Sequence, residues 1–181
     1  ANTKAVATPT TGGSVAGIQS VASAGDRNAQ FTLARMYREG DGVDRDNALA
    51  LHWLTEAAKR DHPAAQMALA RLYLDGTAGT QRDMDSAARW LDRAAHLGNA
   101  EAQYELATLT REGVSVKRDP IRAYVWYALS ARGGYTPAAA VEGGASAALT
   151  ADQMSVAKEL LAAFQPGDFD KLRSDFINPV K

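Results

Sequence analysis

The feature that most constrains this chain of 181 residues is an internal repeat. Three segments of similar sequence begin at Ala29 (AQFTLARMYREG), Ala65 (AQMALARLYLDG) and Ala102 (AQYELATLTREG), so they are spaced 36 and then 37 residues apart. A period of this size is typical of arrays in which each unit buries its apolar face only against its neighbours. We therefore predict a short repeat array.

Each repeat is predicted to form two helices. Alanine (37 residues) and leucine (16) far outnumber valine and isoleucine together (13), a balance that favours helices over strands. The first helix of each unit ends at a glycine suited to the left-handed C′ position, and the second begins at an aspartate suited to N-capping. These residues are Gly40, Gly76 and Gly113, and Asp46, Asp83 and Asp119.

Two further repeat positions are predicted to hold the units together. All three tryptophans, Trp53, Trp90 and Trp126, fall at one position of the second helix, on the same stripe as small alanines. We interpret them as buried packing residues between units rather than as a carbohydrate-stacking set. Gln30, Gln66 and Gln103 share a position of the first helix, where we expect hydrogen bonds between units.

These matched positions resemble the Sel-one-like repeats (SLR), a branch of the tetratricopeptide-like superfamily. The first unit is similar to that family's pattern at Leu33, Tyr37, Gly40, Asp46 and Trp53, and the resemblance covers about residues 29–140. It implies an all-α fold, a right-handed α/α superhelical solenoid of three repeats with irregular helical caps.

The expected organisation follows from the repeat positions. We expect a flexible tail or linker at 1–13, a capping helix at 14–28, repeats at 29–64, 65–101 and 102–137, a degenerate fourth helix and a C-terminal capping helix within 138–164, and a C-terminal tail at 165–181.

Both ends of the array are predicted to be covered. Thr150 and Gln153 form a capping box ahead of a helix from about Ala151 to Phe164. After it, Phe169, Leu172 and Phe176 lie on one side of a predicted short helical segment. We expect this segment to fold back over the last unit and cover the open end of the array.

Charge and composition exclude several classes of function. Lys and Arg number 20 against 21 Asp and Glu, so the chain lacks the basic excess that a nucleic-acid-binding protein needs. There is no cysteine and no apolar run long enough to span a membrane. The chain begins with Ala1, and we expect a processed form or an excised fragment of a longer protein. Nucleic acid and direct membrane insertion are therefore not expected.

The candidate metal and cofactor motifs are weak. The three histidines, His52, His62 and His96, have no spacing typical of a metal site, and we interpret them as surface or helix-end residues. Acidic pairs such as Asp44 and Asp46 lack a twelve-residue calcium loop, and no phosphate-binding glycine loop occurs. We expect no cofactor and no metal.

Ser155 and Lys158 form the S-x-x-K pattern of serine β-lactamases and penicillin-binding proteins. A cysteine-rich branch of the SLR family has been linked to β-lactam binding, and the resemblance therefore makes this pair a candidate. The companion S-D-N and K-T-G motifs are absent, and we interpret the pair as a chance match on the exposed side of the last helix. No catalytic residue is predicted.

One set of residues indicates a binding surface. Phe31, Arg35 and Arg38 lie within about 60° of one another on the first helix, on the side opposite Leu33 and Tyr37. The resemblance implies that the first helices line the concave surface of the solenoid. Aromatic residues, methionine and arginine are enriched at protein interfaces, although an ordinary solvated face is an equally strong alternative. The candidate partner-binding residues are Phe31, Arg35, Arg38, Met67, Arg71, Tyr104 and Arg111.

The predicted function is that of a non-enzymatic scaffold or adaptor that binds another protein through an acidic, amphipathic segment. The resemblance implies a bacterial protein of the periplasm or cell envelope. The segments AYVWYALSARGG and LTADQMSVAKELLAAF also resemble the closing part of the periplasmic region of polar localisation factors of the PodJ type. A structural spacer within a longer membrane-anchored protein and a β-lactam-binding hydrolase remain as alternatives.

Overall fold

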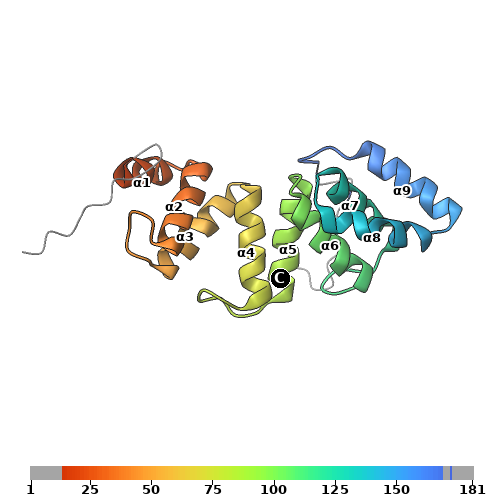
Figure 1. Ribbon diagram of the computed structural model, residues 1–181, viewed down its shortest axis with the longest axis horizontal. Coiled ribbons are helices and arrows are strands. Elements are labelled where there is room, and N and C mark those ends of the chain that lie inside the picture. Colours follow the sequence, from red (N-terminus) through yellow and green to blue (C-terminus); the bar gives the residue numbers. More distant parts are fainter. Residues whose placement is uncertain (1–13, 169–171, 173–181) are drawn as a thin grey trace, which may run out of the picture.

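The computed structural model describes residues 14–168 and Leu172, and these residues form an elongated row of nine helices (Figure 1). The helices are Val15–Ser23 (α1), Arg27–Glu39 (α2), Asn47–Lys59 (α3), Pro63–Asp75 (α4), Met84–His96 (α5), Ala100–Glu112 (α6), Pro120–Arg132 (α7), Thr136–Ala147 (α8) and Ala151–Ala163 (α9). No strand occurs among the residues described, so the prediction of an all-α fold is confirmed.

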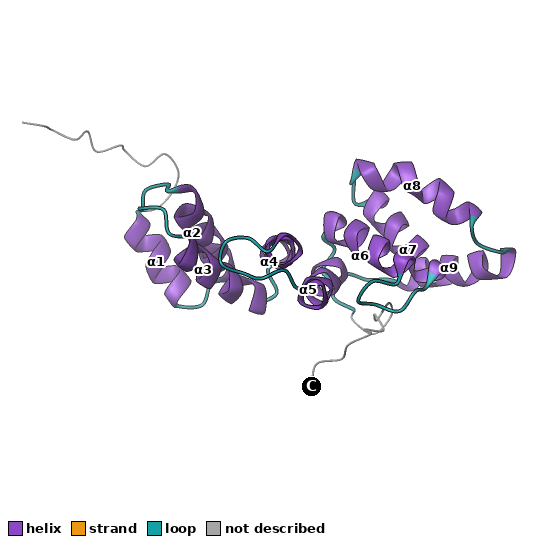
Figure 2. Ribbon diagram, turned by 90° about the horizontal axis from the view of Figure 1, so that it is seen from below, coloured by secondary structure: helices purple, strands orange, loops and turns teal. Residues whose placement is uncertain are grey.

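Consecutive helices pair into hairpins that stack along the row (Figure 2). We call α2 and α3 unit 1, α4 and α5 unit 2, and α6 and α7 unit 3. The first junction is the contact of unit 1 with unit 2, and the second junction is the contact of unit 2 with unit 3. This arrangement is a repeat solenoid, as the spacing of the three segments predicted.

The turns within and between hairpins are set by local capping. Gly40, Gly76 and Gly113 end the first helix of each unit with φ of 75°, 66° and 76°, a left-handed backbone that favours glycine. The aspartate that precedes each second helix accepts hydrogen bonds from two amides of its first turn, as at Asp46, Asp83 and Asp119. Both predicted signals are confirmed.

A buried glutamine joins each unit to the helix before it. Gln30, Gln66 and Gln103 each donate a 3.0 Å hydrogen bond through Nε2 to the carbonyl oxygen eight residues earlier, at Ala22, Ala58 and Ala95. Because Ala22 belongs to α1, this helix occupies the place of a second helix in an incomplete preceding unit. In α8 the corresponding position is Ala139, so the fourth hairpin lacks this bond.

The tryptophan prediction holds fully for one residue of the three. Trp126 is completely buried, whereas Trp53 and Trp90 are only partly buried at the edges of the core. The rings of His96 and Phe164 cover Trp126, at centroid distances of 5.0 and 5.5 Å. The Trp90 ring instead meets the Arg93 guanidinium at 5.6 Å. The three tryptophans therefore differ in how far other segments of the chain cover their rings.

The cover over Trp126 comes from the C-terminal part of the chain. Helix α9 begins at the predicted capping box of Thr150 and Gln153 and packs against α7. The Gly167 amide then donates a 2.7 Å hydrogen bond to the His96 carbonyl at the end of α5, and Leu172 is fully buried in the same core cluster as Trp126. The C-terminal segment thus extends past unit 3 and reaches the second junction, between units 2 and 3. Phe169 and Phe176, which were predicted to belong to this cover, lie outside the described residues.

Candidate partner-binding surface

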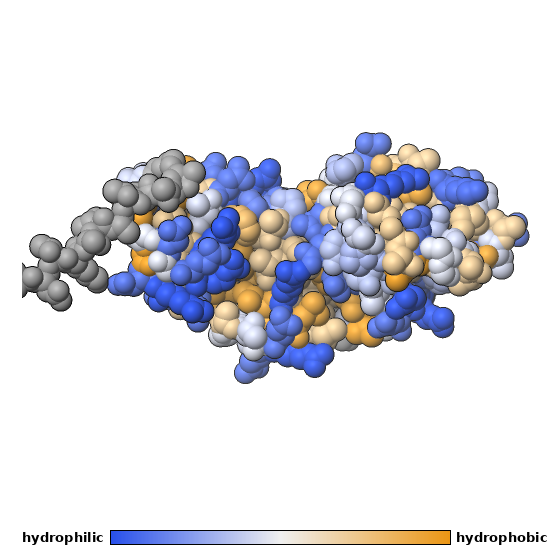
Figure 3. All heavy atoms as spheres, in the orientation of Figure 1, coloured by the Kyte–Doolittle hydropathy of each residue, from blue (hydrophilic) through white to orange (hydrophobic). Residues whose placement is uncertain are grey.

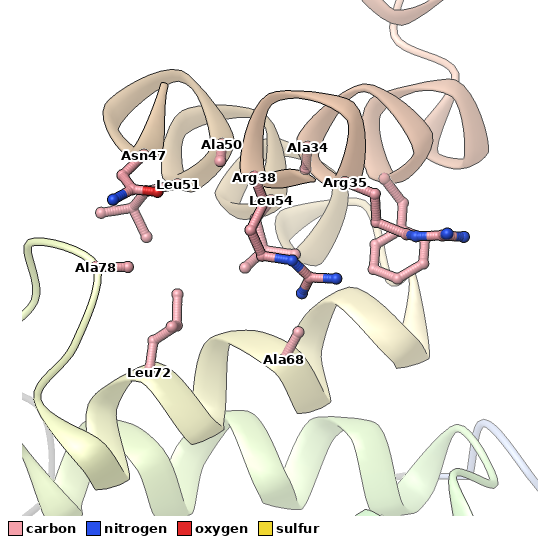
Figure 4. Close-up of a pocket in the computed structure, with 11 residues that line it drawn as sticks. Ala34, Arg35, Arg38, Asn47, Ala50, Leu51, Leu54, Ala68, Leu72 and Ala78 are labelled. Carbon is pink, nitrogen blue, oxygen red and sulfur yellow. The ribbon is translucent and has the colours of Figure 1, made fainter. Parts of the chain in front are cut away.

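A small pocket that is open to solvent lies at the first junction (Figure 4). Helix α4 forms one wall, and Figure 4 shows Ala68 and Leu72 pointing from it toward the two helices of unit 1. Figure 3 shows apolar side chains gathered near α4, between more hydrophilic surfaces. The lining residues are Phe31, Ala34, Arg35, Arg38, Asn47, Ala50, Leu51, Leu54, Ala68, Leu72 and Ala78.

Three of the seven predicted binding residues meet at this pocket: Phe31, Arg35 and Arg38. The two arginine side chains are more than half exposed and share one carboxylate, that of Glu39, at 3.7 Å from Arg35 and 2.8 Å from Arg38. The hydrogen bond from Arg38 lowers the pKa of Glu39, so this carboxylate stays ionised. The rim of the pocket therefore carries a net positive charge beside an apolar floor.

Phe31 is held at the edge of the pocket by a stacked histidine. Its ring lies 4.4 Å from that of His62, and Nδ1 of His62 accepts a hydrogen bond of 3.2 Å from the Ala65 amide, which caps α4. Burial, together with the nearby Arg27 charge, lowers the pKa of His62. Phe31 remains half-buried, so part of its ring is available for contact.

Met67 does not belong to an exposed surface. Only 4% of it is exposed, and it packs in the core cluster that also contains Leu91, Leu106 and Leu109. The helical wheel places Met67 on the same stripe as Phe31 and Tyr104, but the packing of unit 2 against unit 3 covers it. Its expected role as a contact residue is therefore wrong.

Arg71 meets carboxylates from its own chain. Its guanidinium pairs with Glu101 of α6 across the second junction. Burial raises the pKa of the neighbouring Glu105, and the charge of Arg71 opposes that shift. The arginine predicted to bind a partner thus connects units 2 and 3.

Tyr104 and Arg111 lie together on unit 3, away from the first-junction pocket. Tyr104 contacts the rings of Tyr127 and Tyr135 at 5.5 and 5.3 Å, and the Arg111 guanidinium lies 5.8 Å from the Tyr127 ring. Arg111 also pairs with Glu112 at 3.1 Å. The seven predicted residues therefore divide into a first-junction group, a unit 3 group and two residues taken up by packing or pairing.

Sequence reasoning missed the second-helix side of the pocket and the loop that borders it. Asn47, Leu51 and Leu54 come from α3, and Ala78 comes from the loop between α4 and α5. The signal that could have found Ala78 is the GTAGTQ sequence from Gly76 to Gln81, which lengthens this loop beyond that of the first repeat.

The residues with weak chemical motifs have structural positions. Ser155 and Lys158 are both exposed on α9, as predicted. His52 is exposed, and His62 and His96 lie at helix ends, as expected; the sequence did not indicate that His96 is also fully buried. It lies at the end of α5 beneath the Phe164 ring, and its Nδ1 lies 2.8 Å from the Asp92 carbonyl oxygen.

Within the described residues, no cluster of three or more histidine and acidic side chains could hold a metal ion. In the same part of the chain, no helix is long and apolar enough to cross a membrane.

Comparison with known proteins agrees with this architecture. The family model described as Sel1 repeat matches residues 27–62, 63–99 and 100–135. The chain belongs to the Sel1 repeat family. Proteins with Sel1 repeats generally mediate protein–protein interactions.

Two solved structures are similar. A Sel1 repeat protein from Oxalobacter formigenes has 35% sequence identity and a TM-score of 0.68, over 70% of this chain and 95% of that one. The protective antigen c5321 of uropathogenic Escherichia coli, which displays an SLR fold, has 22% identity and a TM-score of 0.59. That match covers 91% of this chain and 44% of the antigen. No curated protein sequence matches the chain, so the resemblance to PodJ-type polar localisation factors gains no support.

Proposed function

We propose that this Sel1 repeat chain is a non-enzymatic scaffold that binds a segment of a partner protein on the surface formed by its first helices. The observation that carries this proposal is the solvent-open apolar pocket with Phe31, Arg35 and Arg38 at its edge. The arginines suit carboxylates of an acidic, amphipathic segment, because a guanidinium can donate two parallel hydrogen bonds to one carboxylate. Tyr104 and Arg111 extend the surface along unit 3.

The energies of these interactions indicate which residues supply affinity and which set orientation. Exposed ion pairs contribute at most about 1 kcal/mol each, so apolar contact must supply most of the affinity. The arginines set the orientation of the segment and the salt dependence of binding. A preformed repeat array also loses little conformational entropy when it binds.

A cross-linked pull-down from the host, followed by mass spectrometry, tests the scaffold role. We expect a partner that is captured by the parent chain, captured less by Arg35→Glu, and captured normally by Arg132→Glu, which makes the same charge change at an exposed position of α7. A protein captured equally by all three chains would move the binding surface elsewhere. Recovery of no partner would favour the spacer role.

We also propose a location in the periplasm or at the cell envelope. The membership of the Sel1 repeat family supports this, since proteins of this family are often extracytoplasmic. Protease treatment of intact and osmotically shocked host cells checks it. The proposal predicts cleavage only after the outer membrane has been opened, and protection until the inner membrane is lysed would contradict it.

A further inference from the structure

The two junctions differ at repeat positions that face each other across them. The matched repeats begin at residues 27, 63 and 100, so Arg35 and Arg71 are both the ninth residue of their unit. The unit that follows Arg71 carries Glu101 and Glu105 at its second and sixth positions. The unit that follows Arg35 carries alanine at both positions, Ala64 and Ala68.

At the second junction these two glutamates interact with the arginine of the preceding unit. Arg71 pairs with Glu101, and Glu105 is half-buried near the same guanidinium. Met67, Leu91 and Leu109 are all at most 8% exposed there, so the space between the helices is filled.

At the first junction the same space is open. Ala68 stands where the second junction has Glu105, and it lines the pocket together with Arg35 (Figure 4). Leu51 and Leu72 on the pocket walls are only partly buried. The only carboxylate that Arg35 and Arg38 meet within the described residues is Glu39, which the two share.

From this difference we infer that the first-junction pocket binds a partner segment that presents a carboxylate beside a bulky apolar side chain. The Asp or Glu of the segment pairs with Arg35 and Arg38, as Glu101 pairs with Arg71 at the second junction. The apolar side chain enters between Leu51, Leu54 and Leu72. The inference rests on the proposed scaffold function and assigns it a site and a ligand chemistry.

The composition of the pocket favours such a segment over other anions. The floor consists of alanine and leucine side chains, which offer nothing to a phosphate or a sugar but can bury an apolar side chain. The chain as a whole has a net charge of −1, so attraction for a polyanion is not expected. A short acidic and apolar peptide satisfies both the rim and the floor.

A phage-displayed library of random dodecapeptides, selected on the full chain, provides the probe. We expect enriched peptides to combine Asp or Glu with Leu, Ile, Phe or Met. Their affinity, measured by fluorescence polarisation, should fall at least tenfold in Ala68→Glu, which fills the pocket, and by up to about fivefold in Arg35→Ala, which removes one exposed ion pair. Ala68→Glu introduces the residue of the second junction, so it fills the pocket and gives Arg35 a carboxylate within the chain.

Two further variants separate the effect of added charge from the effect of filling the pocket. Ala64→Glu introduces a carboxylate at the position of Glu101 but does not line the pocket, and we expect a smaller loss that diminishes as salt is raised. Ala162→Glu adds the same charge at an exposed position of α9 and should leave the affinity unchanged. Circular dichroism melts establish that each variant is folded.

Peptides without acidic residues, or peptides whose affinity is the same in Ala68→Glu and in the parent, would overturn this inference, as would a selection without binders. If the enriched peptides instead depend on Tyr104 and Arg111, binding by the first-helix surface stands and only the assignment to the first junction fails. Loss of the proposed function itself would appear separately, as recovery of no partner in the host pull-down.

Discussion

The first and second junctions are built from the same repeat and differ in what fills and covers them. Both have the left-handed glycine, the capping aspartate and the glutamine that bonds to the preceding unit. The second junction adds the Arg71–Glu101 pair and the C-terminal segment that covers Trp126. The first junction has alanines and a pocket instead. The capping and hydrogen-bonding pattern can therefore repeat while single side chains decide whether a junction is closed or open.

The largest expected effect separates the three tryptophans. Trp126→Ala removes a completely buried ring, and such a change costs about 3 to 5 kcal/mol of unfolding free energy. Trp53→Ala and Trp90→Ala remove partly buried rings and should each cost clearly less. Denaturant unfolding of the three variants measures the order. A cost for Trp53→Ala equal to that for Trp126→Ala would show that the two ends of the array are equally well packed.

This order differs from the one that the repeat alone predicts. In a regular array the middle tryptophan, Trp90, has neighbours on both sides and should contribute most. In the structure, α9 and the residues after it make Trp126 the best covered of the three. The comparison of Trp90→Ala with Trp126→Ala therefore tests the C-terminal cover directly.

The second largest effect is expected when the C-terminal segment that covers Trp126 is weakened. Leu172→Ala removes a fully buried leucine and should cost about 2 to 3 kcal/mol. Because repeat units are coupled mainly to their neighbours, the loss should fall on the second junction. Hydrogen exchange should show faster exchange in α5 and α7, with α2 nearly unchanged. Equal acceleration at both ends would mean that the array unfolds as one cooperative unit.

Much of the fold could be predicted because its signals are local. A glycine with positive φ and an aspartate that caps a helix depend on a few neighbouring residues, and they recur at a fixed spacing. The glutamine bonds were equally accessible, since each spans only eight residues. Periodicity thus gave the helices, the hairpins and their stacking.

The errors and omissions concern contacts between distant parts of the chain. Met67 and His96 are buried by segments that no helical wheel contains, and Arg71 pairs with a glutamate 30 residues away. Comparison of repeat positions could have indicated the Arg71 pair, because Glu101 occupies the repeat position that Ala64 occupies in unit 2. It could not have placed Leu172 against the second junction, since the C-terminal segment has no counterpart in the repeats.

A smaller effect is expected from a substitution that gives the first junction the ion pair of the second junction. Ala64→Glu gives Arg35 the carboxylate that Arg71 already has, and an exposed pair of this kind contributes at most about 1 kcal/mol. We expect a slight rise in the melting temperature at low salt that disappears at high salt. The reversed substitution, Glu101→Ala, should lower it by a similar amount. A large change in either variant would indicate that these residues alter packing as well as charge.

The smallest effect distinguishes the caps of α4 and α6. His62 caps α4 by accepting the Ala65 amide through Nδ1, whereas Asn99 caps α6 with an amide oxygen that does not titrate. The folded-state pKa of His62 is lowered, mainly by burial and further by Arg27, although the nearby Asp26 acts in the opposite direction. The folded chain therefore favours the neutral ring, which alone can accept this bond.

The sign of the pH effect follows from that preference. Above about pH 6.5, the ordinary pKa of histidine, the ring is neutral in the folded and the unfolded chain. The contribution of the His62 cap to the unfolding free energy is then fully present. As pH falls below that value the unfolded chain binds a proton first, so stability declines until the folded-state pKa is passed. His62→Asn retains a capping oxygen and cannot titrate, so its unfolding free energy should vary less than that of the parent between pH 7 and pH 5. Because His62 is partly exposed, we expect only a small difference between the two curves. Parallel curves over this range would mean that Nδ1 of His62 does not serve as the cap of α4.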